Sequence, residues 1–205
     1  MNSCATQSFY NNLELSFEKA WSIIEPGAIK RTSPAHTPAV ATLCPDGTPQ
    51  QRVMVLRAAN RANRQLRFHT DARAAKVAQH GAASVLMYDA DEKVQLRLGG
   101  WATVQTEGPE VDAAWAGSTT FARRCYMAEH APGSLATEPM SGLPEWIEGK
   151  QPEESQLTEF RPNFALLWVI IDSVEWLYLS NAGHRRARWR WDETGTAWSG
   201  NWLIP

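Results

Sequence analysis

The sequence has no long apolar run and no framework of paired cysteines. No stretch of about 18 apolar residues occurs, which argues against a membrane-spanning helix. Cys4, Cys44 and Cys125 are odd in number and lack metal-ligand spacing, which favours a reducing compartment over a disulfide-bonded scaffold. The opening MNSCATQSFYNN has no basic region followed by an apolar run. We therefore expect no signal peptide and a cytoplasmic protein with no membrane partner.

The sequence also lacks an excess of charge of either sign. Lys and Arg number 20 against 22 Asp and Glu, for a net charge of −2. Proteins that bind nucleic acids usually gather basic residues on one face, and no basic block is present, so we expect no nucleic-acid partner. No Ser-His-Asp, Cys-His, metal-ligand or paired-carboxylate arrangement stands out. We therefore expect no metal site, and the sequence does not identify catalytic side chains.

Apolar and aromatic residues are plentiful. Hydrophobic residues make up 43% of the 205, enough for a real core and one domain spanning residues 1–205. Ten tryptophans are present, six of them between residues 168 and 202. Tryptophan is favoured at interfaces and around planar ligands, although burial in a core is its commoner fate.

Periodicity predicts a mainly β chain with a few helices. Residues 9–25 carry apolar side chains at helical spacing and predict an N-terminal helix that stops at Pro26-Gly27. Further helices are predicted over 72–80, with Asp71 as N-cap, and within 109–130. The predicted strands cover 38–44, 51–57, 64–70, 83–89, 93–106, 164–180, 184–192 and 197–205.

The predicted elements favour an α+β fold with a small antiparallel barrel of about seven strands and helices packed outside it. Gly99-Gly100, inside a long strand, predicts a bulge or sharp bend where the sheet curls. Residues 131–160 are rich in Pro, Gly and Glu and predict a loop-rich excursion instead of a second domain.

The segment QRVMVLR has an arginine near each end of an apolar strand. Side chains alternate along a strand, so Arg52 and Arg57 point to opposite faces. The two can hold one ligand only if the strand bends or ends there. The alternative is a pair of exposed arginines that flank a core strand, since arginine is mostly a surface residue.

The segment FHTDARAAK, residues 68–76, predicts a strand followed by a helix N-terminus, which suits a phosphate group. Thr70 can donate its hydroxyl there, and Arg73 and Lys76 can reach back toward the anion. The alternative is a capped surface helix with solvated basic side chains.

Two further strands carry polar faces. Gln95 and Arg97 share a strand face that can hydrogen-bond the edge of a polar ring, or that can simply be the solvent face of a sheet. HRRARWRW alternates basic and aromatic residues, a pattern also found in proteins that bind single-stranded nucleic acid. The near-neutral overall charge argues against that interpretation.

Taken in order, these motifs resemble the pyridoxamine 5′-phosphate oxidase family of FMN-binding split-barrel proteins. The resemblance covers roughly residues 36–205, and the ordered set is more specific than any single motif. The motifs that carry it are QRVMVLR, FHTDARAAK, VQLRLGGWA, FRPNFALLWVI, VEWLYL, HRRARW and NWLIP. The resemblance implies an FMN-binding split β-barrel of the antiparallel Greek-key type.

The resemblance also implies FMN as the cofactor and assigns its contacts. Arg52 and Arg57 would hold the phosphate or the ribityl oxygens, and Thr70 and Lys76 would hold the phosphate. Gln95 would face the flavin. The positions assigned to FMN by motif are Arg52, Val53, Met54, Val55, Leu56, Arg57, Thr70, Lys76, Gln95 and Arg188.

Two departures from the family pattern bear on the site. Ala75 stands where the family has a phosphate-binding arginine, and Arg73 is the candidate to replace it. His184 and Arg186 stand where the family's Arg and His hold the pyridoxal phosphate substrate. The cofactor half of the site is therefore expected to be retained and the substrate half to be changed.

The function implied by the resemblance is an FMN-dependent oxidoreductase with an altered substrate site. One alternative is a flavin- or tetrapyrrole-binding module without turnover, and a lesser one is genuine pyridoxamine 5′-phosphate oxidase activity. In this family the flavin lies at a subunit interface, so the resemblance implies a homodimer with FMN between the subunits and a small-molecule substrate.

Overall fold

The computed structural model describes residues 9–78 and 81–205. The chain forms two compact units. The first unit comprises Met1–Phe68, Gly81–Ala102 and Trp168–Pro205, and the second comprises His69–His80 and Thr103–Leu167. No helix of the described residues is long and apolar enough to cross a membrane.

The N-terminal helix is confirmed as α1, Leu13–Gly27, preceded by a short 3-10 turn, η1, at Phe9–Asn11. Asn12 caps it by accepting a hydrogen bond from the Leu15 N–H at 3.0 Å. Pro26 does not stop the helix, which runs one residue further. The end of α1 packs closely against η2 (Pro34–His36). A Cβ on Gly27 would lie 2.6 Å from the Ala35 carbonyl oxygen, so only glycine fits at position 27.

The described residues form a sheet of nine strands, compared with eight predicted strand ranges and a predicted barrel of about seven strands. The strand beyond the eight predicted ranges arises because residues 51–57 split into two. The strands are β1 (Ala39–Leu43), β2 (Pro49–Val53), β3 (Leu56–Asn60), β4 (Gln65–Asp71), β5 (Gly81–Asp89), β6 (Val94–Gln105), β7 (Phe164–Tyr178), β8 (Arg185–Asp192) and β9 (Ala197–Leu203).

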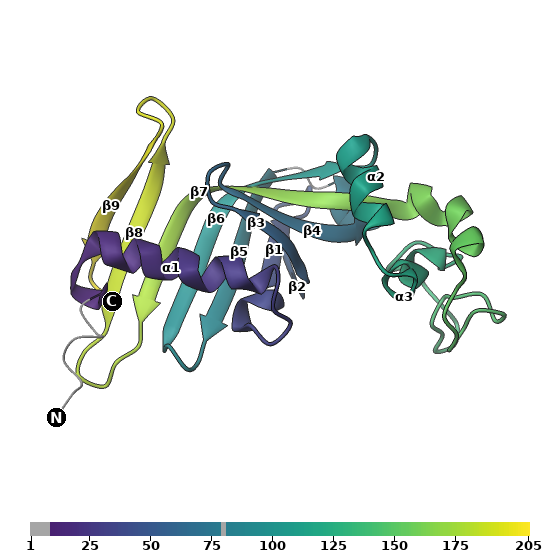
Figure 1. Cartoon of the computed structure of the whole chain (residues 1–205), viewed down its shortest axis with the longest axis horizontal. Helices are drawn as coiled ribbons and strands as arrows, with labels where there is room; N and C mark the ends of the chain where they lie inside the picture. The colour runs from purple at the N-terminus through teal and green to yellow at the C-terminus, as the bar shows by residue number, and fades with distance from the viewer. Residues whose placement is uncertain (1–8, 79–80) are drawn as a thin grey trace. The chain divides into compact units, whose positions relative to one another are not determined.

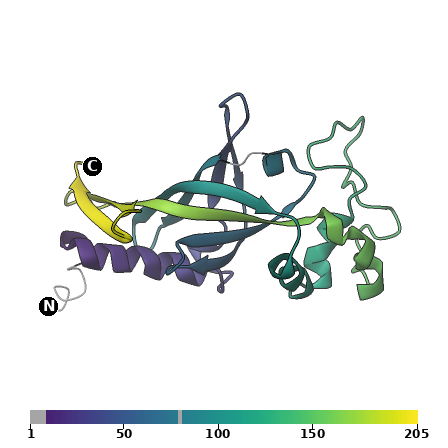
Figure 2. The same cartoon turned by 90° about the horizontal axis from the view of Figure 1, so that it is seen from above.

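The strand order is β2-β1-β5-β6-β7-β4-β3, and β8 pairs with both β7 and β9. Pairs β1–β2, β1–β5, β3–β4, β5–β6, β7–β8 and β8–β9 are antiparallel. In the first unit α1 runs across strands β3, β8 and β9 (Figure 1) and lies against one side of them (Figure 2). The Phe17 ring of α1 packs 5.1 Å from that of Trp189 and 5.4 Å from that of Trp198.

The second unit contains the remaining helices, α2 (Pro109–Ala116) and α3 (Thr120–Arg123), as predicted within 109–130. Two 3-10 segments, η4 (Arg124–Met127) and η5 (Glu154–Asn163), flank residues 128–153, which contain no helix or strand. The rings of Trp115, Tyr126 and His69 surround buried Phe164 and form the aromatic core of this unit.

The helix predicted over 72–80 is wrong for the residues that the structure describes. Asp71 is the last residue of β4, and a turn and a 3-10 segment, η3 (Ala75–Ala78), follow it; residues 79–80 lie outside the described residues. The Asp71 carboxylate accepts the Arg73 N–H at 2.8 Å. Such a local side-chain bond offers the backbone an alternative to the helix.

Of the bulge or sharp bend predicted at Gly99-Gly100, a bulge is absent from the pairing with β5. The pairing of β5 with β6 is continuous from Gly81↔Ala102 to Asp89↔Val94. A Cβ on Gly100 would lie 1.9 Å from the Ile170 carbonyl oxygen of β7. Gly100 therefore permits the close approach of β7, while the register between β5 and β6 stays unbroken.

Candidate functional site

The segment QRVMVLR is not one strand. Strand β2 ends at Val53, and β3 begins at Leu56. The first arm pairs with β1 and the second with β4. The pairing of β3 with β4 shifts register between Leu56 and Ala58, which places Arg57 at an irregularity of bulge type. The strand therefore has the break that binding of one ligand by both arginines would require.

The interruption separates inward from outward side chains. Met54 and Leu56 are buried, and the Met54 N–H donates to the Pro38 carbonyl at 3.0 Å. Val53 is 68% exposed, Val55 is half-buried and Arg57 is exposed. The two core residues therefore fix the break, and a ligand can approach the side chains that point outward.

Arg52 is half-buried on β2, opposite Val40 of β1. Its Nη1 donates to the Thr42 hydroxyl at 2.7 Å and to the Val40 carbonyl at 3.5 Å, and its Nη2 donates to the Gln50 side-chain oxygen at 3.5 Å. Desolvation lowers the pKa of Arg52, and the nearby Cys44 opposes that effect. An arginine stays charged in proteins. Because no carboxylate of the described residues forms an ion pair with Arg52, its charge can act on a ligand.

Gln95 and Arg188 lie in the first unit on β6 and β8, two strands that both pair with β7. Gln95 is half-buried on β6, opposite Tyr88 of β5. Arg188 is half-buried on β8, between Glu175 of β7 and Asn201 of β9. Both positions leave a polar side chain on a sheet face, as strand alternation predicts.

The predicted substrate residues have partners within the first unit. Arg186 donates to the Glu175 carboxylate at 3.0 and 2.8 Å, and Arg97 binds the same carboxylate. The exposed His184 accepts the Ser180 N–H at 3.1 Å through Nδ1. Sequence analysis missed Glu175, whose signal was its position in VEWLYL, on the strand next to the arginines.

Thr70, Arg73 and Lys76 belong to the second unit. Thr70 is 4% exposed, and its hydroxyl has no hydrogen-bond partner in the part of the chain that the structure describes. A buried unpartnered hydroxyl costs about 1–3 kcal/mol. A phosphate or ribityl oxygen of FMN would satisfy it, so this residue fits the cofactor. Lys76 is half-buried on η3.

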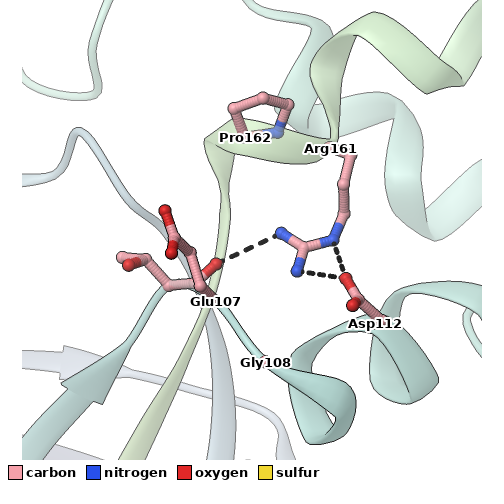
Figure 3. A pocket seen from close by; sticks show the side chains of 6 residues that line it. Glu107, Gly108, Asp112, Arg161 and Pro162 are labelled. Atoms are coloured by element: carbon pink, nitrogen blue, oxygen red, sulfur yellow. Dashed lines mark hydrogen bonds and ion pairs between the residues drawn. The ribbon is translucent and has the colours of Figure 1, made fainter.

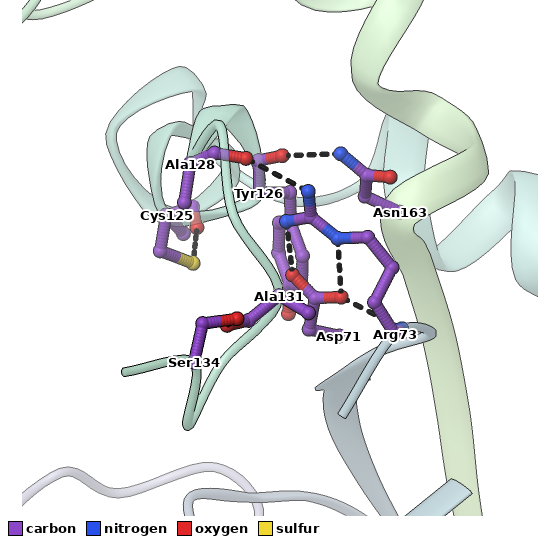
Figure 4. Close-up of polar contacts among 9 residues, drawn as sticks. Asp71, Arg73, Cys125, Tyr126, Ala128, Ala131, Ser134 and Asn163 are labelled. Atoms are coloured by element: carbon purple, nitrogen blue, oxygen red, sulfur yellow. Dashed lines mark hydrogen bonds and ion pairs between the residues drawn. The ribbon is translucent and has the colours of Figure 1, made fainter. Parts of the chain in front are cut away.

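Arg73 is engaged by protein atoms, as Figure 4 shows. Its Nε and Nη2 donate to the two Asp71 oxygens at 3.0 and 2.8 Å, and its Nη1 donates to the Ala128 carbonyl at 2.8 Å. Hydrogen bonding to Asp71 raises the pKa of Arg73, against an opposing effect of desolvation. The positive charge of Arg73 is therefore already paired with the Asp71 carboxylate two residues earlier.

The second unit also contains a pocket of about 290 Å³ that Arg161 helps to line (Figure 3). Arg161 donates to Asp112 from Nε at 3.0 Å and from Nη2 at 2.6 Å, and more weakly to the Thr106 carbonyl at 3.3 Å. These bonds join η5 to α2. Arg161 and Pro162 belong to the FRPNF motif, and the arginine of this motif links η5 to α2 through Asp112.

Comparisons with known proteins agree with this architecture. Residues 18–106 match the family described as pyridoxamine 5′-phosphate oxidase, FMN-binding domain. No curated protein matches the chain. A pyridoxamine 5′-phosphate oxidase-related, FMN-binding protein from Nostoc punctiforme is 22% identical with a TM-score of 0.69, covering 100% of both chains.

PhzG from Burkholderia lata, solved with tetrahydrophenazine-1-carboxylic acid, is 20% identical with a TM-score of 0.69, covering 100% of this chain and 99% of that one. Because both identities are low, these likenesses bear on the fold alone. The mainly antiparallel sheet with few helices matches the FMN-binding split barrel, so the predicted fold class is confirmed.

Proposed function

We propose that this chain binds FMN and works as an FMN-dependent oxidoreductase, because residues 18–106 match the family described as pyridoxamine 5′-phosphate oxidase, FMN-binding domain. The family match carries the proposal. Its range contains every predicted FMN position except Arg188.

Two structural observations support FMN as the ligand. The break between β2 and β3 lets Arg52 and Arg57 depart from strict alternation. The buried Thr70 hydroxyl needs an acceptor or a donor that the described residues do not provide. We assign Arg52, Arg57, Thr70 and Lys76 to the phosphate-ribityl tail of FMN, and Gln95 and Arg188 to the flavin ring.

When bound, FMN supplies the redox chemistry, and the protein supplies binding, orientation and a polar environment. We assign the outward backbone and side chains from Val53 to Val55 to one side of the ring. The core positions of Met54 and Leu56 hold this segment in place. The chain's own side chains are not required to act as nucleophile or metal ligand.

We further propose a substrate other than pyridoxamine 5′-phosphate. A phosphate ester is held best by cations with no competing carboxylate. Arg186, at the predicted substrate position, is paired with Glu175, and Arg97 shares that carboxylate. His184 and Arg186 therefore offer a different charge pattern from a free Arg-His pair.

Reconstitution with FMN tests the proposal. We expect a yellow protein with a flavin absorption spectrum and close to one flavin per chain after gel filtration. Steady-state assays with reduced nicotinamides, pyridoxamine 5′-phosphate and haem then separate an oxidoreductase from a binding module without turnover. A folded protein that retains no flavin would defeat the proposal, and oxidation of pyridoxamine 5′-phosphate at about 1 per second or faster would overturn the altered substrate site.

A further inference from the structure

The Asp71–Arg73 pair is the best-connected charged group at the end of β4. Arg73 forms a two-pronged ion pair with Asp71 and a third hydrogen bond to the Ala128 carbonyl. The Asp71 carboxylate also accepts the Arg73 backbone N–H. Asp71 and Arg73 are two residues apart, whereas Ala128 is 55 residues further along the chain. We call this arrangement the Arg73 clasp.

A second set of bonds joins the same two segments. The Ala72 N–H donates to the Asn163 carbonyl at 2.8 Å, and the Asn163 side chain donates to the Tyr126 carbonyl at 2.8 Å. Figure 4 shows Arg73 and Asn163 both directed toward the stretch from Tyr126 to Ala128. The turn after β4 is thus tied to the stretch from Tyr126 to Ala128 directly by Arg73 and indirectly through Asn163.

Burial makes the clasp rigid. The Asp71 side chain is 9% exposed and that of Arg73 is 26% exposed. Two-pronged arginine–carboxylate pairs are geometrically specific, and they are screened less by solvent when partly buried. Turning Arg73 outward would leave the Asp71 carboxylate buried without its partner, which costs several kcal/mol in comparable pairs.

We propose that Arg73 is a positioning residue that holds the turn after Thr70 in shape for the FMN phosphate, and that it is not itself a phosphate ligand. This inference rests on the proposed FMN binding. It reassigns the residue that sequence analysis put forward to replace the arginine missing at Ala75. Arg73 acts through Asp71 and Ala128. It does not supply the phosphate contact that an arginine at position 75 would make.

Asp71→Asn separates the two roles. If Arg73 bound the phosphate directly, this change would free its guanidinium from Asp71 and remove a nearby negative charge. FMN affinity would then stay unchanged or increase. A clasp would be broken, so Asp71→Asn and Arg73→Gln should each weaken FMN binding by about tenfold or more. Because both variants break one unit, the double variant should bind no more weakly than the weaker single variant.

Arg73→Lys supplies a second discriminator, read by flavin-fluorescence titration. Lysine binds phosphate as a point charge but cannot form the two-pronged pair and the Ala128 bond together. We expect no rescue relative to Arg73→Gln. Arg124→Gln is the matched control, since Arg124 of η4 precedes Ala128 and also donates to a carbonyl, that of Lys150, and we expect wild-type affinity.

Hydrogen exchange of the flavin-free protein gives a readout that is independent of FMN. Asp71→Asn and Arg73→Gln should both speed exchange of the Ala72 and Glu129 amides, which bond to the Asn163 and Gly142 carbonyls. The inference is overturned by unchanged exchange in both variants, by rescue with lysine, or by wild-type FMN affinity in Asp71→Asn. A wild-type protein that binds no FMN would instead remove the proposed function.

Discussion

Thr70 near the end of β4 and Arg73 in the turn that follows lie three positions apart and differ in what they can offer a ligand. The Thr70 hydroxyl is buried without a partner among the described residues, whereas the Arg73 guanidinium is satisfied by Asp71 and Ala128. A ligand gains most from a group that the protein leaves unsatisfied. At this scale Thr70 is the better-supported cofactor residue.

Thr70→Val should have opposite effects on stability and on binding. Removing the unpartnered hydroxyl should raise the stability of the flavin-free protein by about 1 kcal/mol, seen as a higher Tm. Loss of a bond to a charged phosphate should weaken FMN binding by about 1.5–3 kcal/mol. Thermal melting and FMN titration measure the two effects, with Thr70→Ser as the control that keeps the hydroxyl. An affinity unchanged in Thr70→Val would remove Thr70 from the site.

Residue types and motif order predicted which side chains to consider, but not their partners. The FHTDARAAK motif matched Thr70 to a family position and offered Arg73 only as a candidate to replace the arginine missing at Ala75. Only the fold shows that Asp71 and a carbonyl 55 residues away engage Arg73. Contacts between distant segments depend on packing, which a local pattern does not contain.

At the scale of elements, the interrupted strand and the 3-10 turn are the features that shape the candidate site. Periodicity predicted residues 51–57 as one strand, and the spacing of the two arginines required a bend only if both bind one ligand. The failed helix over 72–80 shows the limit of helix propensity, since the Asp71 side chain competes for the backbone N–H groups. Long apolar strands such as β7 were predicted well because their composition leaves little choice.

The close approach of β6 and β7 gives a prediction on stability. A Cβ at Gly100 meets the Ile170 backbone oxygen at 1.9 Å, whereas a Cβ at Gly99 meets only the rotatable Ser173 hydroxyl at 2.5 Å. Gly100→Ala should therefore lower the free energy of unfolding by about 2–3 kcal/mol, and Gly99→Ala by less than about 1 kcal/mol. Urea unfolding of both variants checks this order, and equal stabilities would refute the packing argument.

At the scale of the whole molecule, one sheet face of the first unit has a row of exposed apolar side chains. Ala39 lies opposite both Val53 and Leu86, so these residues share a face, and Tyr88 follows two positions after Leu86. Val53 is 68% exposed, Leu86 40% and Tyr88 50%. Contiguous exposed apolar groups are typical of interaction surfaces. We propose a second copy of the chain as the partner.

Leu86→Glu should convert a wild-type dimer to a monomer in sedimentation velocity, because a charge would be buried at the interface. Ile204→Lys, at a 90% exposed position outside this row, is the control and should leave the dimer intact. Wild-type protein that sediments as a monomer at micromolar concentration, or a Leu86→Glu variant that stays dimeric, would contradict the proposal.

A crystal structure of the protein with FMN tests the central claim most directly. The account predicts the FMN phosphate-ribityl tail within hydrogen-bond distance of the Thr70 hydroxyl and of the Arg52 guanidinium, the flavin ring beside residues 53–55, and Arg73 still bound to Asp71. Flavin bound elsewhere, or an unpartnered Thr70 hydroxyl beside a fully occupied FMN, would contradict it.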